Sequence, residues 1–348
     1  MDEQKEIRFP LWKKRHTLPV IAKRKSITLL ILIIAAAALL PGGAFGTFYM
    51  VVSGALLALL LTADRSLLWL ISIPGVGIIA YLTHMLFAAE GTGILWILSA
   101  FLYIPVGIVL AACIYARRGL TVTTAALAVV IAILLLSSAG IQLQLTYGNI
   151  REGAVILWEQ LQAGLTDMLS SVGLPGENGV LFVYTEKDIQ AIIQSAVMLL
   201  PAMGILTCQL LAYLCAKLYR LLALAMGAGF LFEKEKWSLT ASAPAYIVFT
   251  VSYFISLFAG ESSVVSYAAF NLFYIFLPVT AAAGFHAVFG VQASRGRGRR
   301  RIPLIILCAV MFFISPVALL TLLAFLGAVR AFFIAVTKWM KKHSDPDA

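Results

Sequence analysis

The segment 264–290 is a nearly uninterrupted apolar run, and it constrains the fold of this chain more than any other stretch. As an α-helix rising about 1.5 Å per residue it would extend roughly 40 Å, which exceeds the roughly 30 Å of a bilayer's hydrocarbon core. A block of arginines follows it directly: Arg295, Arg297, Arg299, Arg300 and Arg301. Basic residues collect on the cytoplasmic side of membrane proteins, so the segment predicts a membrane-spanning helix that ends in the cytoplasm.

Similar apolar runs recur along the whole chain. Hydrophobic residues make up 61% of the 348 residues and charged residues only 12%, with a mean hydropathy of +0.97. A soluble domain has no core large enough to bury this much apolar surface, whereas lipid can face it. The sequence therefore predicts an all-α fold: a polytopic integral membrane helical bundle of about 8–10 membrane segments, some of them short or re-entrant.

Polarity divides the chain into an arm, a membrane domain and a tail. We expect residues 1–26 to form a basic cytoplasmic arm, residues 27–335 a single membrane domain, and residues 336–348 a polar tail. Residues 147–188 predict an outer segment that contains an interfacial amphipathic helix. The apolar residues that recur there at helical spacing are Ala154, Leu157, Trp158, Leu161, Leu165, Met168, Leu169 and Val172.

The distribution of basic residues predicts the topology. If residues 27–62 cross the membrane twice, turning at residues 41–46, the outer loops before the last segment contain only the basic residues Arg151 and Lys187. A single crossing would reverse every segment after Arg65, and the bias would largely vanish. The double crossing is therefore favoured, which predicts a multi-pass protein of the cell membrane with a cytoplasmic amino terminus.

The end of the chain leaves two alternatives open. One pass through residues 302–329 would leave Arg330, Lys338, Lys341 and Lys342 outside the cell. A hairpin at Ser315-Pro316 would return them to the cytoplasm, but its first arm of about twelve residues is too short for a full crossing. We favour the hairpin, as a re-entrant or strongly tilted pair, because it agrees with the charge bias.

The sequence lacks the familiar signatures of P-loop nucleotide binding, zinc proteases and serine hydrolases. It contains no GxxxxGK[ST], HExxH or GxSxG motif and no paired acidic residues within a span. The four cysteines, Cys113, Cys208, Cys215 and Cys308, lie in apolar segments without metal-ligand spacing. The sequence therefore predicts no enzyme, no catalytic residue, no cofactor and no metal. The net charge of +10 comes from basic residues between apolar runs, so the expected partner is the lipid bilayer and not nucleic acid.

Tyr267, Asn271 and Tyr274 recur at spacings of four and three, so they share one face of the predicted helix. Gln209, on another long helix, is a natural partner for Asn271. Hydrogen bonds between helices that hold the bundle together are the favoured interpretation of this polar stripe. The alternative is a binding site for a small molecule, with Tyr267, Asn271, Tyr274 and Gln209 as its ligand-binding residues.

Residues 194–338 carry several pieces that resemble the YybS-like family of uncharacterised bacterial multi-pass membrane proteins. These pieces are Leu199-Leu200-Pro201 in a long helix, the loop Phe232 to Trp237, Asn271-Leu272-Phe273-Tyr274, the run from Gly284 to Phe289, and a proline-split apolar end. This family is distantly similar to the substrate-binding components of energy-coupling-factor transporters, which bind a nutrient and rely on separate ATPase and scaffold subunits. The chain departs from the pattern at Pro278, where such families usually carry a further polar residue.

The resemblance implies a small-molecule-binding or transport component without its own ATPase, which works with other membrane subunits. The alternative function is a membrane scaffold or regulatory partner protein with no transport activity, whose polar groups only pack the bundle.

Overall fold

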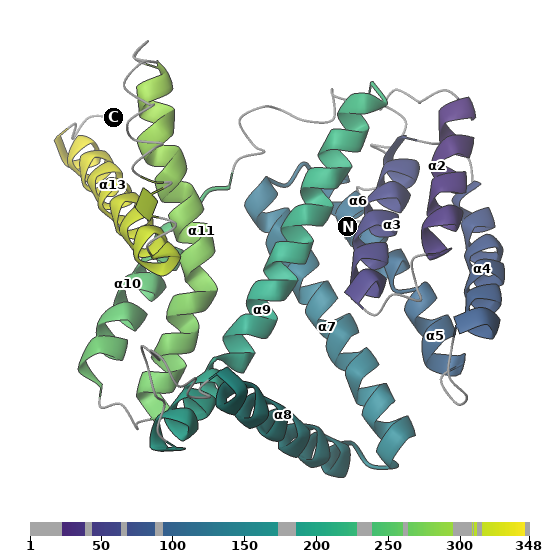
Figure 1. Cartoon of the computed structure of the whole chain (residues 1–348). Helices are drawn as coiled ribbons and strands as arrows, with labels where there is room; N and C mark the ends of the chain where they lie inside the picture. The colour runs from purple at the N-terminus through teal and green to yellow at the C-terminus, as the bar shows by residue number, and fades with distance from the viewer. Residues whose placement is uncertain are drawn as a thin grey trace, which may run out of the picture. The chain divides into compact units, whose positions relative to one another are not determined.

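The computed structural model describes residues 23–38, 44–63, 68–87, 93–172, 186–227, 239–259, 264–294, 308, 310–311 and 315–344. Every regular element in these ranges is a helix, and none of the described residues forms a strand (Figure 1). Most of the predicted arm, the predicted turn at residues 41–43, the arginine block and most of residues 302–314 lie outside the described residues.

The chain divides into two compact units. Unit 1 comprises Met1–Met168 and Thr207–Ser238, and unit 2 comprises Leu169–Leu206 and Leu239–Ala348. The long helix α9 (Glu186–Ala225) belongs to both, since its first half lies in unit 2 and its second half in unit 1. The other elements are α2 (Lys23–Ala36), α3 (Ala44–Ala63), η3 (Leu68–Ile71), α4 (Ser72–Phe87), α5 (Gly93–Ala100), α6 (Tyr103–Tyr115), α7 (Leu120–Tyr147) and α8 (Ile150–Val172), followed by α10 (Ala243–Phe258), α11 (Val264–Ser294) and α13 (Pro316–Ser344).

The helices confirm the prediction of an all-α, polytopic membrane bundle. Among the described residues, six stretches are long and apolar enough to cross a membrane: Trp69–Leu86, Ile97–Tyr115, Leu120–Tyr147, Met198–Ala225, Val264–His286 and Val317–Thr337. Three shorter apolar helices lie at Lys25–Ala36, Gly46–Thr62 and Ala243–Phe258. Together these helices accommodate the predicted number of segments among the residues that are described.

Residues 27–62 fold as two helices that return the chain to one end of unit 1. At the start of α2, the Lys25 Nζ donates a hydrogen bond to the carbonyl of Met226, just past the end of α9, at 2.9 Å. At the end of α3, the hydroxyl of Thr62 lies 2.9 Å from that of Tyr219, also in the last turns of α9. Both ends of residues 27–62 therefore lie near the last turns of α9, which agrees with the predicted turn within this stretch.

Within unit 1, α3 and α6 pack side by side and run in the same direction. The hydroxyl of Tyr49, near the start of α3, donates to the carbonyl of Ala100 just before α6 at 2.8 Å. At the other end, the hydroxyl of Tyr115 donates to the carbonyl of Leu61 at 2.7 Å. Glycine allows the close contact between them, because a Cβ at Gly54 would lie 2.7 Å from a Val106 methyl group.

A turn interrupts the helical stretch between Gly93 and Tyr115. The chain turns at Phe101 and Leu102, between α5 and α6. Pro105 explains the break: it has no N–H to donate to the Phe101 carbonyl, and its ring clashes with that carbonyl in a regular helix. The Phe101 carbonyl instead accepts a hydrogen bond from the N–H of Ile104, three residues later, at 3.1 Å. This spacing is that of a 3₁₀ turn.

The amphipathic helix predicted within residues 147–188 is present as α8. Gly148 ends α7 in the left-handed conformation, with φ of 71° and its N–H bonded to the carbonyl of Gln144. The Asn149 side chain then caps the start of α8 by accepting from the N–H of Arg151 at 2.9 Å. Figure 1 shows α8 turning away from α7 at this corner, and its apolar residues Leu157 and Met168 stay exposed.

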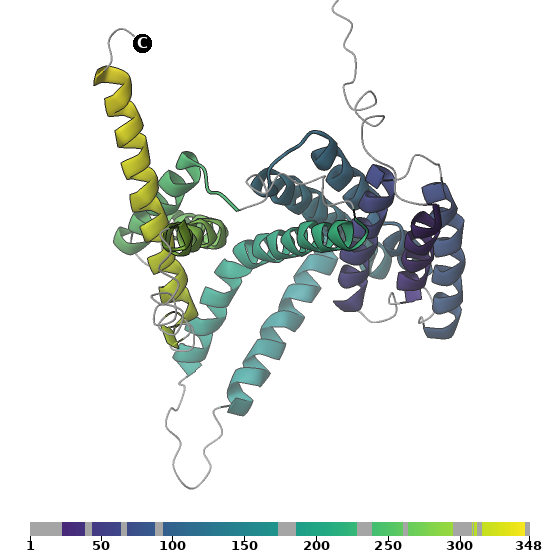
Figure 2. The same cartoon turned by 90° about the horizontal axis from the view of Figure 1, so that it is seen from above.

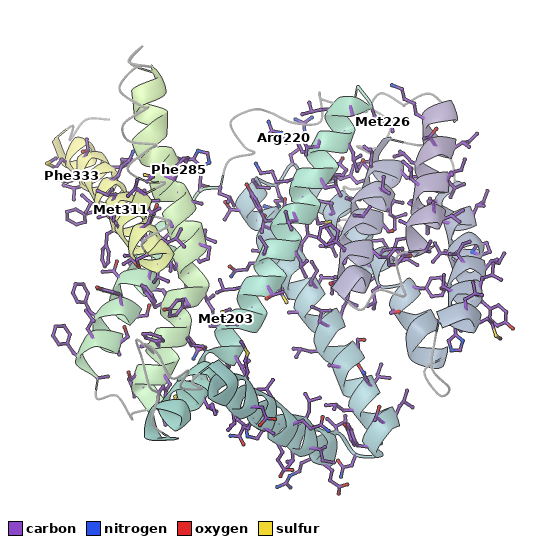
Figure 3. The ribbon with its side chains drawn as sticks, viewed as in Figure 1. Met203, Arg220, Met226, Phe285, Met311 and Phe333 are labelled. Carbon is purple, nitrogen blue, oxygen red and sulfur yellow. The ribbon has the colours of Figure 1, made fainter. Side chains whose placement is uncertain are left out.

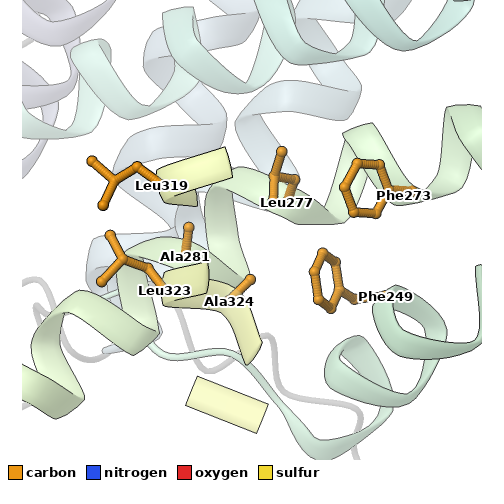
Figure 4. Packing of buried hydrophobic residues seen from close by; sticks show 7 residues of the cluster. All are labelled: Phe249, Phe273, Leu277, Ala281, Leu319, Leu323 and Ala324. Atoms are coloured by element: carbon orange, nitrogen blue, oxygen red, sulfur yellow. The ribbon is translucent and has the colours of Figure 1, made fainter. Parts of the chain in front are cut away.

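Unit 2 is built around α11, which packs against α10 and α13. Its buried core comprises Phe249, Phe273, Leu277, Ala281, Leu319, Leu323 and Ala324 (Figure 4). Phe249 stacks on Phe273 with ring centroids 5.3 Å apart. A Cβ added at Gly284 would overlap the backbone carbonyl of Leu323, so the α11 and α13 backbones touch at this position.

Helix α13 begins at the predicted Ser315-Pro316 break. The Ser315 hydroxyl accepts from the N–H of Ala318 at 3.3 Å, and Pro316 takes the first helical position, where no N–H is needed. The first arm of the predicted hairpin falls mostly on residues outside the described ranges. Figure 2 shows α11 nearly end-on and α13 nearly side-on, so the two helices cross steeply.

Candidate functional site

Asn271 lies half-buried on α11, and its carboxamide joins α11 to α9 inside unit 2. Its Nδ2 group donates to the carbonyl of Met198 at 2.8 Å and to the carbonyl of Tyr267 at 2.9 Å. Its Oδ1 atom accepts from the N–H of Ala202 at 3.0 Å. Both amide protons and the carbonyl oxygen therefore bond to backbone groups, two of these three bonds reaching a neighbouring helix.

The position of these bonds on α9 follows from Pro201. A proline inside a helix lacks the N–H that would bond to the carbonyl four residues earlier, here Val197, and its ring pushes that carbonyl away. Met198 and Ala202 are the next pair that a regular helix would join, carbonyl to N–H. Asn271 bonds to both members of this pair, so its side-chain amide acts like an inserted peptide group beside the proline.

A second proline interrupts the hydrogen bonding of α11 itself. Pro278 has no N–H for the carbonyl of Tyr274, one turn beyond Asn271. The hydroxyl of Thr280 bonds to the carbonyls of Phe276 and Leu277 at 2.8 and 3.1 Å. Unit 2 thus holds two proline-opened turns, which deprive the carbonyls of Val197 and Tyr274 of their helical donors within apolar segments.

The two tyrosines of the predicted stripe have different surroundings. Tyr267 is half-buried, and its backbone carbonyl accepts the bond from Asn271. Tyr274 is half-buried against the aromatic core, where its ring meets the rings of Phe270 and Phe273 edge-on, with centroids 5.1 Å apart in each case. The structure therefore places Tyr267, Asn271 and Tyr274 together on α11, as the spacing predicts.

Gln209 belongs to unit 1, so the structure does not bring it together with the three α11 residues inside one unit. Its Oε1 atom is buried and has no hydrogen-bond partner among the described residues. The predicted partnership with Asn271 is replaced by backbone groups beside Pro201.

Sequence reasoning missed the α9 backbone as the partner of Asn271, although the signal was present. A proline in the middle of an apolar span exposes backbone groups that lipid cannot satisfy, so a polar side chain on a neighbouring helix is needed. Asn271 is such a side chain.

Among the described residues, no group of three or more His, Cys, Asp or Glu side chains could hold a metal ion.

The searches for similar proteins give no match to a family model, a curated protein or a solved structure.

Proposed function

We propose that the chain is a small-molecule-binding or transport component of a bacterial cell membrane, without an ATPase of its own. The observation that carries this proposal is the position of Pro201 inside α9, together with the Asn271 side chain bonded beside it. Transporters build many of their substrate and ion sites from backbone groups at membrane depth that a regular helix does not pair, and a proline inside a helix leaves such a group. The resemblance to the YybS-like family supports the same class.

In this proposal Asn271 positions the site and Tyr267 and Tyr274 border it. The carbonyls of Val197 and Tyr274, which the prolines deprive of helical donors, supply acceptors for a polar ligand. Gln209, in unit 1, is not needed for this arrangement. Transport would then require separate ATPase and scaffold subunits, as in the systems that the sequence resembles.

Thermal-shift measurements against a panel of vitamins and other metabolites test ligand binding. A ligand should raise the melting temperature of the wild type as its concentration exceeds its dissociation constant. Tyr274→Phe retains the ring and removes the hydroxyl, so it should weaken the response; Gln209→Leu is the control and should respond like the wild type. A wild-type protein that responds to no compound would contradict the proposal.

The alternative function is a membrane scaffold or regulatory partner. It is favoured by the full use of the Asn271 carboxamide in bonds to backbone groups, which is what structural packing requires. Co-purification from the native membrane separates the two functions. A transport component should bring down an ATPase and a helical scaffold subunit, and recovery of neither would favour the alternative.

The proposed orientation has a cytoplasmic amino terminus. It is supported by the helix ends that meet near the end of α9, since Lys25, Arg117 and Arg118 occupy the ends of helices joined there. Cysteines introduced near Gly176 should react with an impermeant thiol reagent in intact cells. Cysteines near Arg299 should react only after permeabilisation, and the reverse pattern would overturn the orientation.

A further inference from the structure

The carboxy-terminal half of α13, residues 328–344, extends beyond the contact that holds the helix to unit 2. The packed residues of α13 are Leu319, Leu323, Ala324 and Gly327, all in its first half. From Gly327 the helix continues for seventeen residues to Ser344, about 25 Å. Figure 2 shows this half running on past α11.

One side of this half is apolar and exposed. Val329, Phe332, Phe333 and Met340 expose 52%, 66%, 63% and 51% of their surface. Relative to position 329, positions 332, 333, 336 and 340 lie three, four, seven and eleven residues further along the helix, so the five positions form one stripe. Figure 3 shows Phe333 projecting outward from α13. An exposed stripe of apolar and aromatic side chains is typical of a surface that lipid or another protein covers.

The other side of the helix carries positive charge. Arg330 is followed by lysines at positions 338, 341 and 342, which at 100° per residue fall within one third of the helix circumference. The stripe of positions 329, 332, 333, 336 and 340 occupies the opposite side. Helix α13 contains no Asp or Glu, so nothing in its own sequence neutralises these charges.

A vertical crossing by α13 conflicts with the position of Arg330. If Val317–Thr337 spanned the hydrocarbon core, Arg330 would lie seven residues, about 10 Å, inside its end. Charged groups at such depth are disfavoured, and they are rare outside bundle interiors. The steep crossing of α13 over α11 also differs from the small angles between neighbouring spanning helices.

We propose that residues 328–344 lie in the headgroup region of one leaflet and bind anionic phospholipid headgroups. The stripe of Val329, Phe332, Phe333 and Met340 enters the acyl boundary, while the basic side faces the phosphates. This combination of a basic side and an aromatic apolar side is the signature of an interfacial helix. The inference is independent of the proposed function, since it involves neither Asn271 nor the proline-opened turns.

Hydrogen exchange of the full-length protein tests this inference. The protein is placed in nanodiscs of phosphatidylcholine, with or without about 30% phosphatidylglycerol, and amide exchange is followed by mass spectrometry. We expect the amides of residues 328–344 to be more protected with phosphatidylglycerol, and this extra protection to be lost in about 0.5 M NaCl. Amides of α7 should be unaffected, which also reports that the protein remains folded.

A charge-matched pair of variants makes the test specific. Each basic residue near an anionic surface contributes about fivefold to binding, so Lys338→Gln with Lys341→Gln should lower the extra protection about 25-fold. The control pair, Arg117→Gln with Arg118→Gln, removes two exposed charges between α6 and α7. It should change the extra protection of residues 328–344 less than twofold. Protection of residues 328–344 that is equal in both lipids, or lowered equally by both pairs, would overturn the inference. Protection that appears only on addition of a soluble protein would indicate a protein partner and overturn it as well.

Discussion

Replacing Asn271 by Leu tests whether its amide compensates for Pro201. The change keeps the approximate size of the side chain and removes the two hydrogen bonds to α9. Interhelical bonds in membrane proteins contribute about 0.6 kcal/mol each, and the buried N–H of Ala202 then loses its partner at a further cost of about 1 kcal/mol. We expect Asn271→Leu to lower the free energy of unfolding by about 2 kcal/mol.

The second part of the test uses Pro201→Ala. An alanine supplies the missing N–H for the Val197 carbonyl and removes the ring clash, so this turn of α9 can relax toward regular geometry, in which Met198 and Ala202 bond to each other. In this background Asn271→Leu should lower the free energy of unfolding by at most about 1 kcal/mol. The double-mutant cycle should therefore give a coupling energy of about 1 kcal/mol between positions 201 and 271.

Reversible unfolding in mixed detergent micelles, followed by circular dichroism, measures all four proteins. Thr280→Val is the matched control, because the Thr280 hydroxyl bonds only to carbonyls of its own helix, those of Phe276 and Leu277. Thr280→Val should lower the free energy of unfolding by the same amount in the wild-type background and in the Pro201→Ala background. Additive effects of Asn271→Leu and Pro201→Ala would refute the compensation that the geometry implies.

Two further predictions concern backbone geometry. Gly284→Ala would force a Cβ into the Leu323 carbonyl and should cost about 3 kcal/mol in the same assay, whereas Gly204→Ala has no neighbour within 4 Å and should cost nothing. Arg117→Gly should raise the free energy of unfolding by up to about 1 kcal/mol, because Arg117 holds a positive φ of 51°; an unchanged or lower value would contradict the role of that conformation.

The apolar pattern predicts most of the helices and little of their pairing. The 264–290 run becomes α11, and the spacing from Ala154 to Val172 becomes α8, because both depend on local composition and periodicity. The charge bias also predicts that residues 27–62 return to one end of the unit, since that bias reflects the whole topology.

The partner of Asn271 could not be predicted from the apolar pattern. Helical periodicity indicates which residues share a face, but it does not indicate which helix lies opposite that face. Gln209 was a chemically reasonable partner, but α9 presents its backbone beside Pro201 instead. The division of α9 between two units is also invisible in an apolar run of constant character. Pro105 could have indicated the break between α5 and α6, since its effect on the preceding turn is local.

In both units, close backbone contacts and side-chain hydrogen bonds to helix carbonyls hold the helices together. Lipid is as apolar as the helix surfaces, so burial of apolar side chains gives little drive for helices to associate. Close backbone contact replaces it, through Gly54 in unit 1 and Gly284 in unit 2. Side chains that donate hydrogen bonds to the carbonyls of a neighbouring helix make the contact specific. Tyr115 donates to α3 in this way, and Asn271 donates to α9. Because a carbonyl without a partner is costly in hydrocarbon, each such donor fixes one particular pairing of helices and disfavours others.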